Sequence, residues 1–249
     1  MSAAVARRLR PASEPPITHR VALVSGANRG IGLAVARQLG ALGMTVLLGA
    51  RDPGRGARAA YQLRDEGIDV TAITLDVTAQ PDIDAAARHI ERQYGRLDVL
   101  INNAGAYYDI NEHPSSAPID SVRSALDTNL LGAWRLGEAL VPLMRSHGYG
   151  RIVNVSSGCG SSALDGESCP AYRVSKAALN AYTRALAAEL DGSGILVNAV
   201  CPGWVATAMG GAGGRPVAEG AAGIVWAACL PAHAAATGGF YRDRQRIPW

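Results

Sequence analysis

The sequence predicts one α/β domain in which a mostly parallel sheet of about seven strands is covered by helices on both faces. Short β-like runs alternate with segments of helical length from residue 21 onward, which implies βαβ crossovers. No internal repeat and no linker-like stretch interrupts this alternation. The 249 residues, 48% of them hydrophobic, are enough to bury one large core, and with 18% charged residues they exclude a disordered chain.

The expected strands follow one another along the chain. They lie at residues 21–25, 45–48, 70–75, 97–102, 151–156, 196–200 and about 239–241. Apolar residues at helical spacing predict two long helices, over about 119–147 and about 170–191. A glycine-rich mobile loop at 210–214 and a short helix near 217–229 complete the domain, which is expected to span residues 19–249.

The segment before this domain, residues 1–18, is rich in Arg and Pro and is expected to form a flexible tail. It lacks the apolar stretch of a secretory signal, and the later stretches without charged residues are interrupted by Pro, Asn or Gly. We therefore expect a cytoplasmic protein that does not span a membrane.

Charge and cysteine content exclude several kinds of partner. The formal net charge is +3 and Arg is scattered along the chain, so no nucleic acid is expected. The four cysteines and five histidines lack metal-ligand spacing, so we expect neither a metal site nor a disulfide framework. Among 24 basic residues only Lys176 is a lysine, an exception that calls for a chemical reason.

A glycine-rich turn follows the first strand and precedes a helix. It consists of Gly26, Ala27, Asn28, Arg29, Gly30, Ile31 and Gly32. Glycine lets the backbone turn tightly and approach a pyrophosphate, which the helix N-terminus can bind. The order GxxxGxG differs from the GxGxxG dinucleotide fingerprint, and glycines also close ordinary strand–helix turns. The missing Gly-Lys-Ser/Thr excludes a P-loop, and the absence of GxSxG weakens an α/β-hydrolase interpretation.

The end of the second strand bears on the choice of cofactor. Arg51 there suits the 2′-phosphate of NADP, whereas enzymes that use NAD usually place an acid at this point. Arg29 could reach the same phosphate, and Arg55 is a weaker third candidate. Alternatively, Arg51 is an ordinary surface residue and Asp52 supplies the acid. The pattern favours NADP(H).

Tyr172 and Lys176 lie four residues apart near the start of the second long helix, so their side chains share one helix face. A neighbouring cation favours the phenolate and lowers the pKa of a tyrosine, which would tune it for ketone reduction. A Tyr and a Lys at this spacing are common by chance, so the pair alone carries little weight.

An ordered series of motifs resembles that of the short-chain dehydrogenase/reductase family. The series comprises the glycine turn, Asn102-Asn103-Ala104-Gly105, Asn129, Ser156-Ser157, Tyr172 with Lys176, and Cys201-Pro202-Gly203-Trp204-Val205-Ala206-Thr207. The resemblance extends over about residues 20–249, and the segments 50–52 and 237–243 look most like the carbonyl reductase branch. It implies a Rossmann-type doubly wound fold and NADPH-dependent reduction of a carbonyl group.

The resemblance also implies roles for four catalytic residues. Tyr172 would donate a proton to the carbonyl oxygen, and Ser157 would hydrogen-bond that oxygen. Lys176 would bind the nicotinamide ribose and lower the pKa of Tyr172. Asn129 would hold a water in a proton relay, although it could also be a plain polar helix residue. Ser157 fits the SxxG pattern, and alternation along the strand lets only one of the two serines face the cleft, so Ser156 stays an alternative.

Further cofactor contacts follow from the same resemblance. Asp76 would accept a hydrogen bond from the adenine amino group, or it could equally cap a helix. The expected cofactor-binding residues are Gly26, Asn28, Arg29, Gly30, Ile31, Gly32, Arg51, Asp76, Val77, Asn103, Ala104, Gly105, Tyr172, Lys176, Pro202, Gly203, Val205 and Thr207.

The expected substrate is a small hydrophobic ketone, aldehyde or quinone. Five loop residues could line its pocket, although each could equally be ordinary packing: Tyr107, Tyr108, Cys159, Trp204 and Met209. The two long helices are expected to pair with those of other copies in a homodimer or homotetramer. An NAD-dependent secondary-alcohol dehydrogenase of the same fold and a non-catalytic NADP-binding regulatory protein stay as alternatives.

Overall fold

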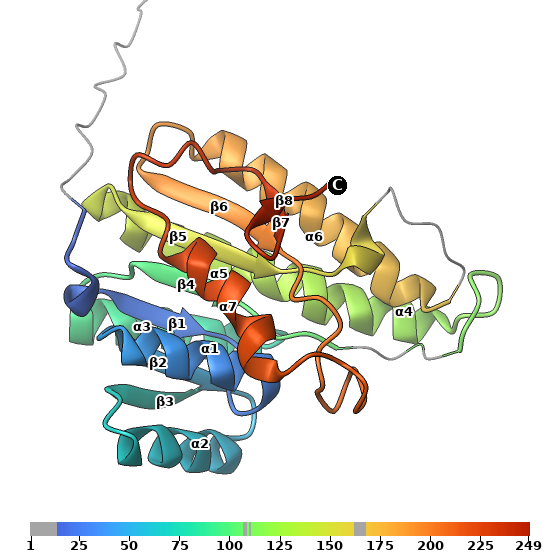
Figure 1. The fold of residues 1–249 in the computed structure, drawn as a ribbon, viewed down its shortest axis with the longest axis horizontal. Coiled ribbons are helices and arrows are strands. Elements are labelled where there is room, and N and C mark those ends of the chain that lie inside the picture. The colour runs from blue at the N-terminus through green and yellow to red at the C-terminus, as the bar shows by residue number, and fades with distance from the viewer. Residues whose placement is uncertain (1–13, 107–108, 110, 162–167) are drawn as a thin grey trace, which may run out of the picture.

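The computed structural model describes residues 14–106, 109, 111–161 and 168–249 of the chain. These residues form one sheet of eight strands in the order β3-β2-β1-β4-β5-β6-β7-β8 (Figure 1). All neighbours are parallel except β7 and β8. The strands are β1 (Val21–Val24), β2 (Thr45–Ala50), β3 (Val70–Thr74), β4 (Val99–Asn102), β5 (Gly150–Val155), β6 (Ile195–Val200), β7 (Phe240–Arg242) and β8 (Gln245–Arg246).

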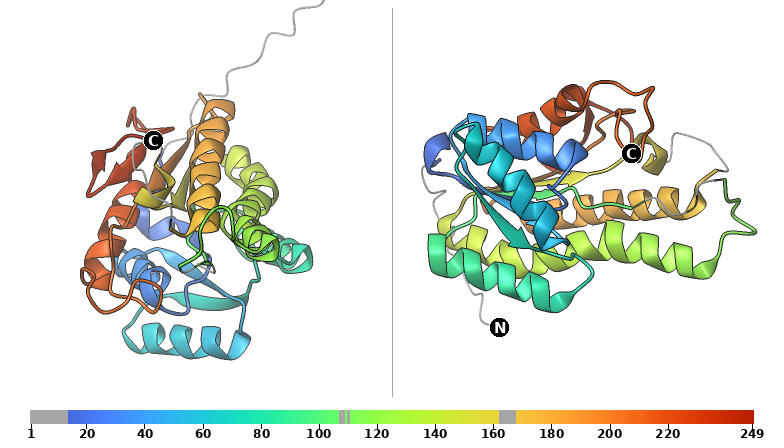
Figure 2. Two further views of the ribbon diagram at one scale, coloured as in Figure 1. Left: turned by 90° about the vertical axis from the view of Figure 1, so that its right-hand side faces the viewer. Right: turned by 90° about the horizontal axis from the view of Figure 1, so that it is seen from below.

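Helices cover both faces of the sheet (Figure 2). Helices α1, α2 and α7 pack on one face, and α3, α5 and α6 pack on the other. Alternation along β1 serves both layers, because Ala22 and Val24 face the first while Val21 and Leu23 face the second. The helices and short turns are η1 (Ile17–His19), α1 (Gly30–Ala41), α2 (Pro53–Asp65), α3 (Gln80–Tyr94), α4 (Ile119–Leu126), η2 (Asp127–Leu131), α5 (Gly132–His147), η3 (Gly158–Gly160), α6 (Pro170–Glu189) and α7 (Val217–Ala228).

The doubly wound α/β fold is confirmed, with two differences in detail. The sheet has eight strands rather than about seven, because the short β8 folds back along β7. The expected helix over residues 119–147 is interrupted by η2, a π-helical turn between α4 and α5. No helix among the described residues combines the length and the apolar character needed to cross a bilayer.

The start of the domain lies earlier than residue 19. Glu14 accepts hydrogen bonds from Arg20 Nη2 (2.9 Å) and from the backbone N–H of Ala232 (2.9 Å), and Ile17 packs against the core. Residues 14–18 of the expected tail therefore contact the body of the protein. Residues 1–13 of that tail lie outside the described residues.

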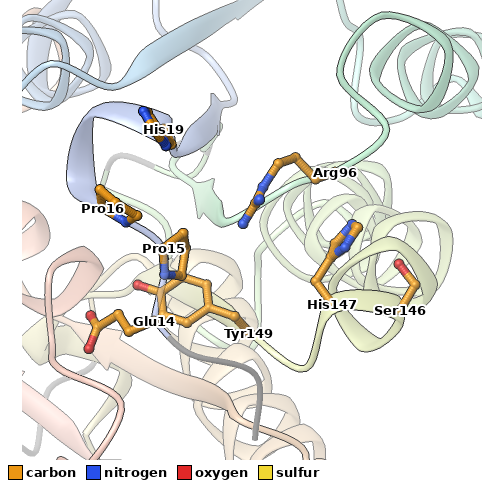
Figure 3. Close-up of a pocket in the computed structure, with 8 residues that line it drawn as sticks. All are labelled: Glu14, Pro15, Pro16, His19, Arg96, Ser146, His147 and Tyr149. Carbon is orange, nitrogen blue, oxygen red and sulfur yellow. The ribbon is translucent and has the colours of Figure 1, made fainter.

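The parallel strands begin at one edge of the sheet, here called the amino edge, and end at the other, the carboxyl edge. A cavity of about 450 Å³ opens at the amino edge (Figure 3). Its lining includes Pro15, Arg96, His147 and Tyr149. His147 ends α5, and Tyr149 directly precedes β5 at that edge. The predicted functional residues follow the strands and lie at the opposite edge.

Candidate active site

The turn after β1 is held against the end of β4. The Asn103 amide nitrogen donates to the carbonyl oxygens of Ser25 (2.9 Å) and Gly26 (3.2 Å). Gly26 has a left-handed φ of 62°, and a Cβ built on Gly32 would lie 2.5 Å from Asn103 Nδ2. Only glycine fits at these two positions, so the residues after β1 and β4 form one compact cradle.

The N-terminus of α1 faces this cradle, and no side chain of the helix neutralises the positive end of its dipole. The capping position is Arg29, whose side chain makes no capping hydrogen bond, and the first turn carries no acidic residue. Free N–H groups and a positive dipole end suit a phosphate group. The residues present therefore fit the pyrophosphate of a dinucleotide.

Arg51 and Asp52 follow β2 near the same edge. Asp52 caps α2 by accepting from Arg55 N (2.9 Å), and its carboxylate also pairs with the Arg55 side chain (3.4 Å). Arg29 and Arg51 are both exposed, and within the described part of the chain neither forms an ion pair. Asp52 thus has local partners, whereas two guanidinium groups stay available to an anionic ligand.

Tyr172 and Lys176 lie on α6, and Ser157 caps the η3 turn that follows β5. The side chains of Ser157 and Tyr172 share a hydrogen bond. Lys176 Nζ donates to the carbonyl oxygen of Val155 (2.8 Å) and lies 5.7 Å from the centre of the Tyr172 ring. A Cβ built on Gly105 would be 3.6 Å from that ammonium, so the β4 end closely approaches it.

Burial dominates the acid–base properties of both groups. Burial raises the pKa of Tyr172 above its ordinary value, and the hydrogen bond from Ser157 opposes that rise. Burial also lowers the pKa of Lys176 to about 8. In the protein without cofactor the pKa of Tyr172 is therefore raised overall, because desolvation outweighs the opposing hydrogen bond. The lowering expected from Lys176 stays a prediction for the protein with cofactor bound.

The two serines that follow β5 have different surroundings. Ser156 is buried, and its hydroxyl donates to Asn180 Oδ1 (2.6 Å) on the inner face of α6. Asn180 in turn donates to the carbonyl oxygen of Gly160 (3.1 Å), so it joins η3 to the helix. Ser157, which bonds Tyr172, is the serine beside the phenol.

Asn129 occupies the middle of the π-helical turn η2 and is almost fully buried. Its Oδ1 accepts from Ala106 N (2.8 Å), and its Nδ2 donates to Ala106 O (2.9 Å) and to Ser175 Oγ (2.9 Å). Ser175 donates onward to the carbonyl oxygen of Tyr172 (2.7 Å). The π-turn therefore directs Asn129 toward α6, as such turns often do at functional sites.

Asp76 and Val77 follow β3 but are engaged locally. Asp76 Oδ1 accepts from the backbone N–H of Thr78 (3.0 Å) and from its hydroxyl (2.8 Å), so it stabilises the turn that precedes α3. It does not cap α3 itself, whose capping position is Ala79. The Val77 side chain packs in the core, and its methyl group lies against Gly132. Only the backbone of Val77 could contribute to a ligand site.

The segment after β6 folds back on itself. Trp204 Nε1 donates to Gly210 O (2.6 Å), and Trp204 and Arg215 are joined by a backbone hydrogen bond (2.8 Å). The Thr207 hydroxyl accepts from Gly210 N (3.0 Å), and Thr207 also faces Gly30 across the cradle. The glycine run 210–214 was expected to be a mobile loop. Hydrogen bonds join residues at both of its ends to the segment 204–207.

The remaining predicted residues of this segment differ in exposure. Pro202 and Gly203 are half-buried, whereas the side chain of Val205 is buried against Gly220 of α7. Trp204 is 64% exposed and Met209 is 47% exposed.

The other expected pocket residues lie elsewhere. Cys159 lines a cavity of about 330 Å³ between η3, Trp249 and the face of α6 that carries Val174 and Ala177. Tyr107 and Tyr108 lie outside the described residues. Among the described residues, no group of three His, Cys, Asp or Glu side chains could hold a metal ion.

Several residues that the motifs did not single out support the site. Ser25 Oγ accepts from the backbone N–H groups of Asn103 and Ala104 (3.0 Å each). Ser175 and Asn180 link α6 to η2 and η3. Asp109 is a buried carboxylate at the first turn of α6. Ser175 and Asn180 could have been found from the sequence as polar residues on the buried face of a predicted helix. Asp109 lies outside the helices and strands, so no such pattern marked it.

Known proteins resemble this chain over most of its length. The short chain dehydrogenase family model matches residues 20–215. Carbonyl reductase (NADPH) 3 of Rattus norvegicus is 35% identical over 277 aligned positions, which cover 92% of this chain and 98% of the relative. The 3-oxoacyl-(acyl-carrier-protein) reductase of Pseudomonas aeruginosa is 35% identical over 190 residues, or 76% of this chain and 75% of the relative.

A solved structure extends the similarity to three dimensions. A variant of actinorhodin polyketide ketoreductase, crystallised with NADPH, superposes with a TM-score of 0.82 at 30% sequence identity. The superposition covers 90% of this chain and 95% of the ketoreductase.

Proposed function

The chain belongs to the short-chain dehydrogenase family, and on that premise we propose that it is an NADPH-dependent carbonyl reductase. The observation that carries the proposal is the hydrogen-bonded pair of Ser157 and Tyr172 beside the buried ammonium of Lys176. This arrangement lies at the carboxyl edge, where parallel α/β sheets bind their ligands. The proposed substrate is a hydrophobic ketone, aldehyde or quinone.

Binding of the cofactor is assigned to three parts of the chain. The uncapped N-terminus of α1 would hold the pyrophosphate, and Arg29 and Arg51 would bind a 2′-phosphate. Lys176 would hold the nicotinamide ribose, and the residues after β3, β4 and β6 would complete the site. When bound, the cofactor would supply the hydride for the carbonyl carbon.

The chain's own residues would provide the proton. Tyr172, kept neutral by burial, donates its phenolic proton to the carbonyl oxygen, and Ser157 stabilises the charge that develops there. Lys176 fixes the face of α6 that carries the phenol, through its bond to the end of β5. Asn129 would hold a relay water through the second lone pair of Oδ1, which no described residue uses.

A homodimer or homotetramer is part of the proposal. Helices α5 and α6 expose large apolar side chains, among them Trp134 at 50% and Val174 at 54%. Trp134 stacks on Tyr182 of α6 at 4.6 Å between ring centres, so its exposed ring lies against the neighbouring helix. Such a surface suits pairing with a second copy.

The test is a screen of ketones, aldehydes and quinones with NADPH and with NADH. Oxidation of the cofactor is measured by its absorbance. We expect turnover with at least one carbonyl class and a kcat/KM for NADPH about tenfold or more above that for NADH, because two guanidinium groups await the phosphate. Arg51→Ala should narrow this preference, while Arg88→Ala on the exposed side of α3 should not. A preference for NADH would overturn the cofactor assignment, and no turnover with any carbonyl would overturn the reductase assignment.

A further inference from the structure

Helix α6 carries Tyr172 and Lys176 but does not cap its own N-terminus. The capping position is Cys169, which has a left-handed φ of 52° and makes no side-chain capping bond. Pro170 follows at the first helical position and has no N–H to bond. The next two backbone N–H groups, those of Ala171 and Tyr172, therefore need an acceptor from elsewhere in the chain.

Asp109 supplies that acceptor from the segment between β4 and α4. One carboxylate oxygen, Oδ2, accepts from Ala171 N (2.6 Å) and from Tyr172 N (3.3 Å). These are the second and third positions of the helix, the two that a capping side chain ordinarily serves. The carboxylate is fully buried and lies at the positive end of the helix dipole.

The same segment is tied to α6 at a second point. Ala106, three residues before Asp109, exchanges two hydrogen bonds with Asn129, and Asn129 donates to Ser175 on the helix. Figure 1 shows the start of α4 beside the N-terminal half of α6. The backbone around Tyr172 is thus held from both sides: Asp109 bonds its N–H, and Ser175 bonds its carbonyl oxygen.

The bonding of Asp109 differs from that of Asp98, which is also fully buried. At the amino edge, both oxygens of Asp98 are used, by Val21 N and by two nitrogens of Arg96. At Asp109 the second oxygen, Oδ1, is buried and has no hydrogen-bond partner among the residues that the structure describes. Leaving a buried polar oxygen without a partner is unfavourable, so stability alone gives little reason to place an aspartate there.

We propose that Asp109 is a positioning residue that sets the place and orientation of Tyr172 through the first turn of α6. This inference rests on the proposed function, since the position of the phenol matters for proton donation to the substrate. Displacements of about 1 Å in a reacting group can cost on the order of a hundredfold in rate. The capping bond would therefore act on kcat more than on cofactor binding, which depends on distant residues such as Arg51.

The test compares three variants of the full chain. Asp109→Ala removes the acceptor, Asp109→Asn keeps one acceptor oxygen without the charge, and Asp98→Asn is the control at the amino edge. We expect Asp109→Ala to lower kcat by about a hundredfold with the Kd for NADPH unchanged, and Asp109→Asn to recover about tenfold of that loss. The control should destabilise the protein but leave kcat per folded molecule unchanged.

A second readout does not depend on turnover. Amide hydrogen exchange at Ala171 and Tyr172 should be faster in Asp109→Ala than in the wild type, and close to wild type in Asp109→Asn. Wild-type exchange or wild-type kcat in Asp109→Ala would overturn the proposal. So would a loss of kcat in Asp98→Asn as large as that in Asp109→Ala. If the wild type reduces no carbonyl, the proposed function fails, and the exchange measurement still decides whether Asp109 fixes this turn. If Asp109→Ala does not fold, Asp109→Asn still decides, because the weaker acceptor should leave its kcat about tenfold below that of the wild type, and a wild-type kcat would overturn the proposal.

Discussion

The two edges of the sheet both bury charged side chains, but these groups bond to different partners. At the amino edge, Arg151 is fully buried and donates to the carbonyl oxygens of Leu230, Gly150 and Gly194. Its guanidinium also lies 4.2 Å from the centre of the Tyr149 ring. There the buried arginine joins backbone segments from three parts of the chain.

At the carboxyl edge, buried polar side chains bond mainly to one another and converge on α6. Asn129 reaches Ser175, Ser156 reaches Asn180, and Ser157 reaches Tyr172. The result is a phenol that can donate a proton beside a single ammonium group.

This difference teaches that neither buried charge nor cavity volume identifies the functional edge. The amino edge has the fully buried Arg151 and a cavity of about 450 Å³, yet the described residues there include no proton donor paired with a hydrogen-bonding group beside a ligand cradle. What distinguishes the carboxyl edge is the combination of a glycine cradle, an uncapped helix N-terminus and a proton donor. Variants at the two edges should therefore separate activity from stability.

The largest effect is expected for Tyr172→Phe. Without the phenolic hydroxyl no proton reaches the substrate oxygen, so kcat should fall by about a thousandfold or more. The Kd for NADPH, measured by fluorescence titration, should stay close to that of the wild type. Turnover of Tyr172→Phe at the wild-type rate would show that Tyr172 is not the proton donor. The carboxyl edge would then lack the acid that distinguishes it from the amino edge.

A smaller loss, about a hundredfold in kcat, is expected for Lys176→Arg. The compact ammonium is buried and bonded to Val155, and a planar guanidinium does not fit the same space. The matched control is Arg145→Lys, an exposed residue of α5 that pairs with Glu189. Equal kcat in these two variants would show that the single lysine has no special role.

The smallest effect on activity is expected at the amino edge, for Arg151→Met. Three carbonyl oxygens lose the hydrogen bond from the guanidinium, so the free energy of unfolding should fall by about 2 kcal/mol. We expect kcat per folded molecule to match the wild type, with stability measured by urea denaturation. A loss of kcat without a loss of stability would contradict the separation of the two edges.

The alternation of strands and helices was predictable because each element carries its own periodicity. Helix α6 was expected over 170–191 and ends at Glu189, and the strands differ from expectation by one or two residues at their ends. The strand β8 was missed because two residues carry no recognisable pattern. The π-turn at Asn129 was missed because apolar residues keep helical spacing on both sides of it.

The candidate site was predictable where its residues are close in sequence. Tyr172 and Lys176 share a helix face at a spacing of four, and Ser156 and Ser157 are adjacent directly after a strand. Asp109 and Ala171 are 62 residues apart, so no local pattern could join them. The same holds for the bond between Glu14 and Ala232, which extends the domain toward the N-terminus.

The burial of Lys176 has a consequence for the chemistry of the whole surface. Because this is the only lysine in the chain, all other basic side chains are guanidinium or imidazole groups. Reagents that acylate primary amines therefore find a single side chain to modify, and it lies beneath the cradle. The rate of its acylation, measured at this residue and apart from the N-terminal amine, would report how accessible the buried ammonium is to reagents.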